Sequence, residues 1–456
     1  MLFHTLPFVL IFLPVTLAAY YAAADHVSLR QWILLSASLT FYSVWDVRFL
    51  PLLLAQVTIT WALAKVSDNG RQLWPIALGI FVNLLSLATF KYLDFAIKSL
   101  EQLIGSTLPH AGLILPIGIS FFTFQLVSYL VDLRRGQSPI YDFRRLALFV
   151  SVFPHLIAGP VVRHNELIPQ FDQDPRRKGV ERRFVIGSFL FALGFVKKVF
   201  VADPLSAIAD PLFVAAGQRM MTMGEAWTAA LSFSFQLFLD FSAYTEMATG
   251  AALMFGLILP ENFNRPYIAR NLREFWRRWH ISLSNFIRDY VYIPMGGSRN
   301  GQIHYVFATI GSMAICGLWH GAGWTFVIWG VLHGAGLVVC RAWQSLNMPL
   351  PGPLAWLITM LFVMIGWVLF RSQDLSTMGN ITAALVGFSG MSGTIDGLPL
   401  LIAGAVLATI VPSAHNVMKL QDERSVWALI ATTIACTTSL VFAGHAKTLS
   451  FLYFQF

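Results

Sequence analysis

Charged side chains are scarce in this sequence of 456 residues: Asp, Glu, Lys and Arg together make up 12%, whereas 56% of the residues are hydrophobic. In soluble proteins about a quarter of the residues are charged, so the composition excludes an ordinary soluble protein. The apolar residues form blocks long enough for the roughly 20-residue helix that crosses a bilayer. The strict alternation of membrane barrel strands is absent. We therefore expect an all-α polytopic membrane protein.

Cysteine is almost as scarce. The three cysteines, Cys316, Cys340 and Cys436, lie in apolar segments without Cys-x-x-Cys spacing, which is typical of small core residues rather than of a disulfide or metal framework. No His-Glu-x-x-His spacing occurs, so we expect no metal site. We also expect no tightly bound cofactor. The formal charge of +8 fits Lys and Arg gathered in cytoplasmic loops, and no nucleic-acid-binding module is visible.

About eleven or twelve membrane crossings are expected, in one domain that covers residues 1–456. The candidate spans are 6–24, 29–47, 49–65, 73–91, 113–133, 184–203, 226–258, 303–319, 322–340, 353–370, 398–415 and 425–443. The first block is expected to be a retained helix rather than a signal peptide, because no Lys or Arg precedes it.

Two apolar segments differ from simple spans. Residues 146–162 contain Pro154, His155, Gly159 and Pro160 between two basic loops, which predicts a re-entrant element beside a central funnel, since broken backbone in a membrane must be buried in protein or line a cavity. Residues 226–259 are too long for one upright span and too short for two, which predicts one tilted or broken helix.

Arginine clusters in the loops 134–145, 163–183 and 265–299 indicate that all three loops are cytoplasmic. This places the N-terminus outside. It also makes 303–340 a hairpin that leaves the cytoplasm and returns, with His320 near its turn. The last two spans have too little charge asymmetry to orient the C-terminus.

Residues 271–293 alternate apolar and basic positions at helical spacing. The apolar stripe consists of Phe275, Trp279, Leu283, Phe286 and Tyr290, and the polar stripe of Arg273, Arg277, His280, Ser284 and Arg288. The pattern predicts an interfacial amphipathic helix. Its cations have two interpretations: anchoring to lipid phosphates, or reception of a phosphopantetheine or coenzyme A arm together with an acidic carrier.

His320 lies in an uncharged stretch between two tryptophans. Gly317, Gly321 and Gly323 surround it, and bare backbone is expected where a ligand or another helix approaches closely. Burial favours the neutral imidazole, which is the form that a general base needs. His155 and His333 are interpreted as packing residues.

Asp240 and Glu246 are six residues apart and therefore point to different faces of a helix. A paired-carboxylate site is disfavoured. We expect one or both to pair with an arginine or to line a polar cavity.

Six stretches together resemble one family. They are LPIGISFFTFQLVSYLVDLRRG (115–136), FPHLIAGPVVRHNELIPQF (153–171), LDFSAYTEMATGAALMFGLILPENFNRPY (239–267), REFWRRWHISLSNFIRDYVYIPMGG (273–297), GLWHGAGWTFVIWGVLHG (317–334) and the terminal FLYFQF. In this order they resemble the membrane-bound O-acyltransferases, most closely the bacterial alginate O-acetylase branch and more distantly the teichoic-acid D-alanyl transferases. The stretch 372–424 matches no family motif.

The resemblance implies that His320 is the catalytic histidine and His280 the second characteristic polar residue. It also implies a ring of helices around a thinned centre, where a cytoplasmic acyl donor meets an extracytoplasmic hydroxyl through a tunnel. Trp319, Trp324, Gly317, Gly321 and Asp240 are expected to shape that tunnel, and Arg273 and Arg277 to receive the donor.

The expected function is transfer of an acyl group, acetyl above all, from a cytoplasmic thioester to hydroxyls of an exported polysaccharide, directly or through a periplasmic partner. The expected location is the inner membrane of a bacterium. Two alternatives from other classes are a transporter or channel and a non-catalytic scaffold of a secretion complex. The sequence leaves open the polymer, a covalent acyl-enzyme, the oligomeric state, and whether acetyl-coenzyme A or an acyl carrier protein is the donor.

Overall fold

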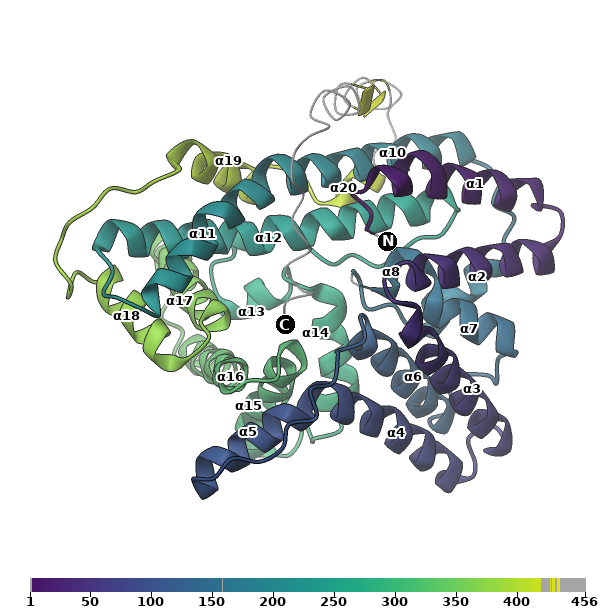
Figure 1. Ribbon diagram of the computed structural model, residues 1–456, viewed down its shortest axis with the longest axis horizontal. Helices are drawn as coiled ribbons and strands as arrows, with labels where there is room; N and C mark the ends of the chain where they lie inside the picture. Colours follow the sequence, from purple (N-terminus) through teal and green to yellow (C-terminus); the bar gives the residue numbers. More distant parts are fainter. Residues whose placement is uncertain (1, 158, 420–426, 428, 431–432, 435–456) are drawn as a thin grey trace. The chain divides into compact units, whose positions relative to one another are not determined.

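The structure is a computed structural model that describes all residues except 1, 158, 420–426, 428, 431–432 and 435–456 (Figure 1). The described residues form helices and loops and no strand, which confirms the all-α prediction. The span expected at 425–443 and the motif FLYFQF lie largely or wholly outside the described residues.

Six helices among the described residues are long and apolar enough to cross a membrane: Val47–Val66, Leu73–Ile104, Val180–Ala216, Gly301–His320, Trp324–Ser345 and Gly352–Arg371. Two shorter apolar helices cover Phe8–Ala22 and Leu398–Thr409. The protein is thus a multi-pass membrane protein, and several of the other expected spans are shorter than a bilayer crossing.

The described chain divides into two compact units, with residues 1–192 and 245–260 in the first and residues 193–244 and 261–419 in the second. Helices α10 (Val180–Lys197) and α12 (Met223–Met254) contribute residues to both. The single acyltransferase domain expected from the sequence stays a prediction.

The first unit is built from the N-terminal helices. They are α1 (Leu13–Ala22), α2 (Val27–Ser43), α3 (Leu50–Val66), α4 (Leu73–Leu87), α5 (Leu93–Ile104), α6 (Ile119–Arg134), α7 (Phe143–Ser151), α8 (Phe153–Leu156) and α9 (His164–Leu167). Helix α4 packs against α3 and α6, and α2 packs against α7.

Two predictions about the irregular segments can be compared directly with the helices. In the predicted re-entrant segment, residues up to Ser151 belong to α7 and Phe153–Leu156 form the single turn α8. Pro154 lies in the first turn of α8, where its missing N–H costs no helical bond. Within the segment 226–259, residues up to Met254 lie in one unbroken helix, α12 (Met223–Met254, 32 residues), and residues 255–259 leave it as a turn and loop.

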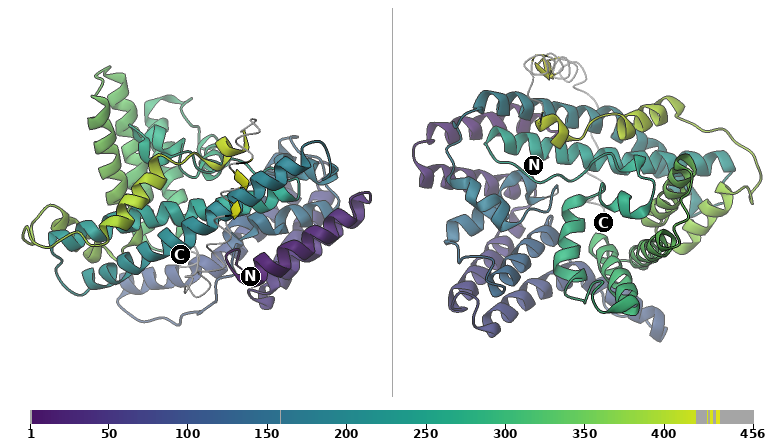
Figure 2. Two further views of the ribbon diagram at one scale, coloured as in Figure 1. Left: turned by 90° about the horizontal axis from the view of Figure 1, so that it is seen from above. Right: turned by 180° about the vertical axis from the view of Figure 1, so that it is seen from behind.

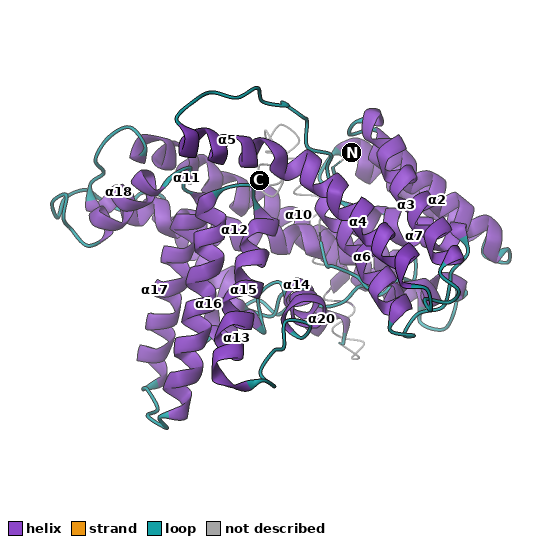
Figure 3. Cartoon of the chain, turned by 90° about the horizontal axis from the view of Figure 1, so that it is seen from below, coloured by secondary structure: helices purple, strands orange, loops and turns teal. Residues whose placement is uncertain are grey.

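The second unit contains the C-terminal helices. They are α11 (Asp203–Ala216), α13 (Leu272–Trp276), α14 (Ile281–Ile287), α15 (Gly301–His320), α16 (Trp324–Ser345), α17 (Gly352–Arg371), α18 (Leu375–Leu385), α19 (Leu398–Thr409) and α20 (Ala414–Met418). Helices α15, α16 and α17 run side by side (Figures 2 and 3).

Glycines allow α15 and α16 to pack at close range in the hairpin. A Cβ on Gly317 would lie 2.1 Å from the carbonyl oxygen of Phe326, and one on Gly330 would lie 2.2 Å from that of Met313. Membrane helices associate through such small residues because the hydrophobic effect does not drive helices together in lipid. The hairpin predicted at 303–340 is therefore present with slightly longer helices.

The amphipathic segment 271–293 is not one continuous helix. The backbone leaves α13 after Trp276 and re-enters a helix at α14, with His280 in the left-handed conformation at φ +42°. Two backbone hydrogen bonds to a distant loop hold this break: Ile281 N–H donates to Asn262 O, and Asn264 N–H donates to Arg278 O, both at 2.9 Å. The break thus aims His280 away from the helical stripe to which the sequence assigned it.

Candidate active site

His320 is the last residue of α15 and is only 4% exposed. Aromatic rings from three helices enclose it. Ring centroids lie 4.9 Å away for Trp319 of α15, 5.3 Å for Trp329 of α16 and 5.4 Å for Phe370 of α17. The imidazole therefore occupies a largely apolar compartment within the second unit.

His280 is fully buried and faces the same compartment. Its ring centroid is 6.4 Å from that of His320 and 6.1 Å from that of Trp319. Phe241 of α12 packs edge-on against it at 4.7 Å. The two histidines that the family resemblance singles out are thus brought together from segments 40 residues apart in sequence.

Asn262 orients the His280 ring. Its Oδ1 accepts a hydrogen bond from the hydroxyl of Ser282 at 2.7 Å and lies 3.0 Å from Nδ1 of His280. An oxygen accepts and cannot donate, so Nδ1 carries the proton. Nε2 is then an acceptor, and it has no hydrogen-bond partner among the described residues.

Burial also sets the charge of His280. Desolvation lowers the pKa of this imidazole from 6.5 to about 3, because an apolar environment disfavours the cation. His280 is neutral at physiological pH.

Two of the glycines around His320, Gly317 and Gly321, are closely packed against α16. The space beside Gly317 is filled by the backbone of Phe326, and a Cβ on Gly321 would lie 2.1 Å from the Phe326 ring. Of the two alternatives that the sequence left open, a ligand or another helix, the structure places a helix there.

The two tryptophans of the motif differ in position. Trp319 is buried beside His320, whereas Trp324, at the start of α16, is 55% exposed. Besides Trp319, the rings that pack against His320 are those of Trp329 and Phe370.

Asp240 belongs to a buried ion cluster. Lys198 Nζ lies 2.7 Å from Asp240 Oδ1 and 2.7 Å from Asp203 Oδ1. Asp240 thus pairs with a cation, as expected, but the cation is a lysine and not the arginine that the sequence analysis named. Glu246 lies in the first unit, where it is buried.

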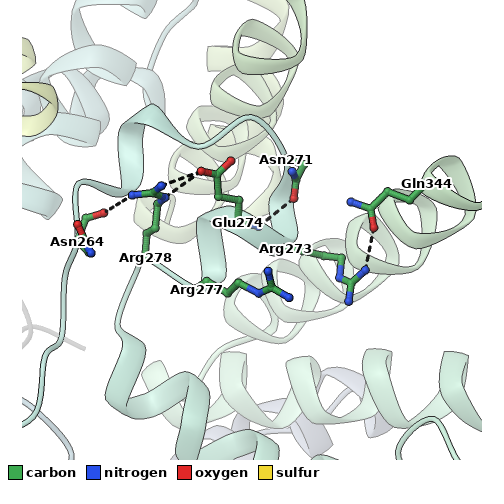
Figure 4. A pocket seen from close by; sticks show the side chains of 7 residues that line it. All are labelled: Asn264, Asn271, Arg273, Glu274, Arg277, Arg278 and Gln344. Atoms are coloured by element: carbon green, nitrogen blue, oxygen red, sulfur yellow. Dashed lines mark hydrogen bonds and ion pairs between the residues drawn. The ribbon is translucent and has the colours of Figure 1, made fainter. Parts of the chain in front are cut away.

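Arg273 and Arg277 line an open cleft of about 560 Å³, which we call the arginine cleft (Figure 4). Its lining residues are Asn264, Asn271, Arg273, Glu274, Arg277, Arg278 and Gln344. All seven belong to the second unit.

The other two histidines have different surroundings. His155 Nδ1 lies 2.9 Å from the side-chain nitrogen of Gln125, as expected of a packing histidine. His333 is fully buried between aromatic rings, with Trp329 at 4.7 Å and Trp276 at 5.4 Å, and neither of its ring nitrogens has a partner among the described residues.

Sequence reasoning missed Asn262, Ser282 and Trp329. Asn262 lies in a loop and acts through an oxygen that contacts a residue 18 positions away, a distance at which one sequence carries no pairing signal. Trp329 lies nine residues after His320, on the second helix of the predicted hairpin. Because the two helices of a hairpin lie side by side, its contact with the end of the first helix could have been predicted.

Comparison with known proteins decides the family. The model of the membrane-bound O-acyltransferase family matches residues 5–373. The chain belongs to this family. It is therefore an enzyme that transfers acyl groups to hydroxyls.

Three relatives show the range of similar proteins. A probable alginate O-acetylase of Pseudomonas aeruginosa is 43% identical over 85% of this chain and 75% of its own length. A peptidoglycan O-acetyltransferase of Helicobacter pylori is 39% identical over 86% of this chain and 81% of its own. A teichoic acid D-alanyltransferase of Streptococcus thermophilus is 27% identical over 67% of this chain and 71% of its own. The resemblance to the alginate O-acetylase branch is thus confirmed.

Proposed function

We propose that the protein transfers an acetyl group from a cytoplasmic thioester to a hydroxyl of an exported polysaccharide in the inner membrane of a bacterium, with His320 as the general base. The observation that carries the proposal is the pair of buried imidazoles, His280 and His320, with ring centroids 6.4 Å apart. The relatives named for alginate and peptidoglycan O-acetylation support the acetyl group and the polysaccharide acceptor.

The reaction balances with one imidazole. The acceptor O–H gives its proton to neutral His320 while its oxygen forms a bond to the thioester carbonyl carbon. The tetrahedral intermediate then collapses, the C–S bond breaks, and the thiolate takes the proton back from the imidazolium. A general base of this kind contributes roughly 10² to 10⁴ in rate.

His280 serves as a hydrogen-bond acceptor. Because Nδ1 holds the proton against Asn262, Nε2 presents a lone pair. Such a lone pair binds an O–H or N–H group of a substrate and does not stabilise an oxyanion. The aromatic rings around His320 exclude water, which protects the thioester from hydrolysis.

In this proposal the acyl donor binds at the arginine cleft. Two exposed guanidiniums, those of Arg273 and Arg277, attract the anionic part of a thioester donor. The acetyl group reaches the polymer either directly or through a periplasmic partner that accepts it first.

Replacement of His320 by Ala tests the proposal. In cells that export the polymer, we expect polymer acetylation to fall by roughly 10² or more, while protein level and polymer export stay normal. The conservative variant H320Q, which keeps the volume and loses the base, is expected to behave in the same way. Acetylation at the wild-type level in both variants would refute His320 as the base, and loss of export alone would favour a scaffold or transporter.

A further inference from the structure

The loop of residues 386–397 joins α18 to α19 and lies beyond the part of the chain that the family model matches, which ends at residue 373 (Figure 1). We call it the apolar loop. Three of its large apolar side chains are exposed: Val386 is 68% exposed, Phe388 85% and Met391 87%. Apolar side chains gathered on a surface mark a place where another molecule binds.

The apolar loop is held in place by the first turns of α12. The carbonyl oxygen of Ser392 accepts a hydrogen bond from Gly224 N–H at 3.0 Å. The N–H of Asp396 donates to the hydroxyl of Thr228, also at 3.0 Å. A Cβ on Gly224 would lie 2.5 Å from the backbone of the loop, so the two backbones are in direct contact. The exposed side chains therefore stand on a fixed base, which lowers the entropic cost of binding a partner.

The charge pattern of the chain puts the apolar loop on the extracytoplasmic side. The arginines of residues 265–299 predict a cytoplasmic loop, and α15, α16 and α17 follow it as three helices that are each long enough to cross the membrane. The end of α17 at Arg371 is therefore extracytoplasmic. The start of α12, which anchors the apolar loop, is assigned to the same side independently, because Val180–Ala216 crosses outward from the cytoplasmic loop 163–183 and α12 begins shortly after it.

The apolar loop lacks the features of a lipid anchor. Irregular backbone does not face the hydrocarbon of a bilayer, where its N–H and C=O groups would lose their hydrogen bonds, and residues 386–397 are not helical. Segments that lie at the membrane surface carry Trp, Tyr, Lys or Arg as anchors. None of these four residue types occurs from 372 to 418. The exposed side chains thus match a protein surface better than lipid headgroups.

The charges near the apolar loop are negative. Asp374 and Asp396 are exposed and are the only charged residues from 372 to 398. Arg219 and Glu225, on either side of the start of α12, form a hydrogen-bonded ion pair at 3.0 Å, so their charges cancel. The complement of this apolar and acidic surface is an apolar pocket bordered by Lys or Arg.

We infer that Phe388 and Met391 insert into an apolar, cation-bordered pocket of an extracytoplasmic protein, which docks on this loop. Aromatic residues and Met are enriched at the buried centres of protein interfaces, as the two exposed side chains require. The inference rests on the proposed function, in which the acetyl group reaches the polymer directly or through a partner, and it selects the route through a partner.

Site-specific photocrosslinking in living cells tests the inference. The full-length protein with the substitution Phe388→p-benzoylphenylalanine is produced in its own bacterium and irradiated, and the adducts are identified by mass spectrometry. We expect an adduct with a protein that has an extracytoplasmic domain. The further substitution D396K should lower the yield of this adduct several-fold, because it replaces an attractive charge by a repulsive one.

Phe307 provides the matched control. It is 71% exposed on the membrane-spanning helix α15, so the same photoreactive residue at this position should give lipid adducts and not the protein adduct. The inference would be overturned if position 388 gave an adduct only with lipid, only with a second copy of this chain or only with a cytoplasmic protein, or gave no adduct. Equal yields with and without D396K would also overturn it.

The variant F388D measures the consequence for function. The side chain is exposed, so thermal melting should match the wild type. Polymer acetylation in cells should fall roughly 10-fold or more, as expected for loss of an interface anchor, while the purified variant releases thiol from an acetyl thioester at the wild-type rate. F388L keeps an apolar anchor and should retain most of the acetylation. Polymer acetylation at the wild-type level in F388D would contradict docking at this loop.

H320A separates this inference from the proposed function. It should keep the protein adduct of position 388 and lose acetylation. If H320A loses acetylation and no protein adduct forms at position 388, only the inference is lost; if the adduct forms and H320A still acetylates, only the general base is lost.

Discussion

Asn262 accepts hydrogen bonds from both Ser282 and His280 through a single side-chain oxygen, at 2.7 and 3.0 Å. One atom of a loop residue thereby decides which nitrogen of a buried imidazole bears the proton. The relationship makes Asn262 a positioning residue for His280.

The first prediction concerns this oxygen. In N262A the Nδ1–H of His280 loses its acceptor, and a buried donor without a partner costs about 1 to 3 kcal/mol. The imidazole can then adopt the other tautomer, so we expect acyl transfer to fall roughly 5- to 100-fold. Initial rates with purified protein measure the effect.

The matched control is S282A, which removes the other hydrogen bond to the same oxygen and leaves His280 its acceptor. It should retain most of the activity. An equal loss in S282A and N262A would mean that the loop, and not the tautomer, matters.

The second prediction follows from the lowered pKa of His280. The folded pKa is about 3 and the reference value is 6.5, so between these values the unfolded chain binds more protons than the folded one. The stabilising contribution is therefore fully present above pH 6.5 and is lost as pH falls from 6.5 toward 3.

For one such group the loss between pH 7 and pH 5 is about 2 kcal/mol. H280N removes the titrating group, and asparagine tolerates the left-handed backbone. Thermal unfolding at the two pH values should show a smaller acid shift in H280N than in the wild type, and identical shifts would argue against burial of a neutral His280.

The third prediction tests the helix contact at Gly317. In G317A the new methyl group would meet the carbonyl oxygen of Phe326 at 2.1 Å, so α15 and α16 must separate, at a cost of about 1 to 3 kcal/mol. We expect a lower melting temperature. In G379A, within α18, nothing lies within 4 Å of the added Cβ, so this variant should be neutral or slightly stabilising.

The fourth prediction concerns the ion cluster. Lys198 faces two carboxylates, so D240N leaves one balanced pair, whereas K198M leaves two anions close together. K198M should therefore be the more destabilising change, since an uncompensated buried charge costs about 3 to 5 kcal/mol. Melting temperatures rank the two variants, and the opposite order would contradict the charge count. Loss of acylation in D240N at unchanged stability would instead indicate that Asp240 lines the substrate path.

The sequence contained enough to predict the all-α class and the hairpin, because the length and apolarity of helices are local properties. It could not predict the break at His280. No Gly or Pro marks that position, and the left-handed turn depends on pairing of Asn262 and Asn264 with a segment far along the chain. Nor could it choose between ligand and helix beside Gly317, since both need the same bare backbone.

Within the site, the sequence predicts which residues take part, but not which residues they contact. The sequence indicates that Asp240 needs a cationic partner. Which cation that is depends on the packing of α12 against the helical segment that carries Lys198. Of the arginine cleft, the sequence predicts only Arg273 and Arg277, which lie on one helical stripe. Asn264 and Gln344 also line the cleft, but they belong to other segments of the chain.

The Lys198 cluster also constrains how the protein is made. Lys198 and Asp203 are on one continuous helical segment, so they can neutralise each other as soon as that segment enters the bilayer. Asp240 is on α12, which is translated later and is buried along most of its length. A buried carboxylate is costly without a partner, so Asp240 is stabilised only once Lys198 lies beside it, and the order of the two segments along the chain matches the order in which these charges must meet.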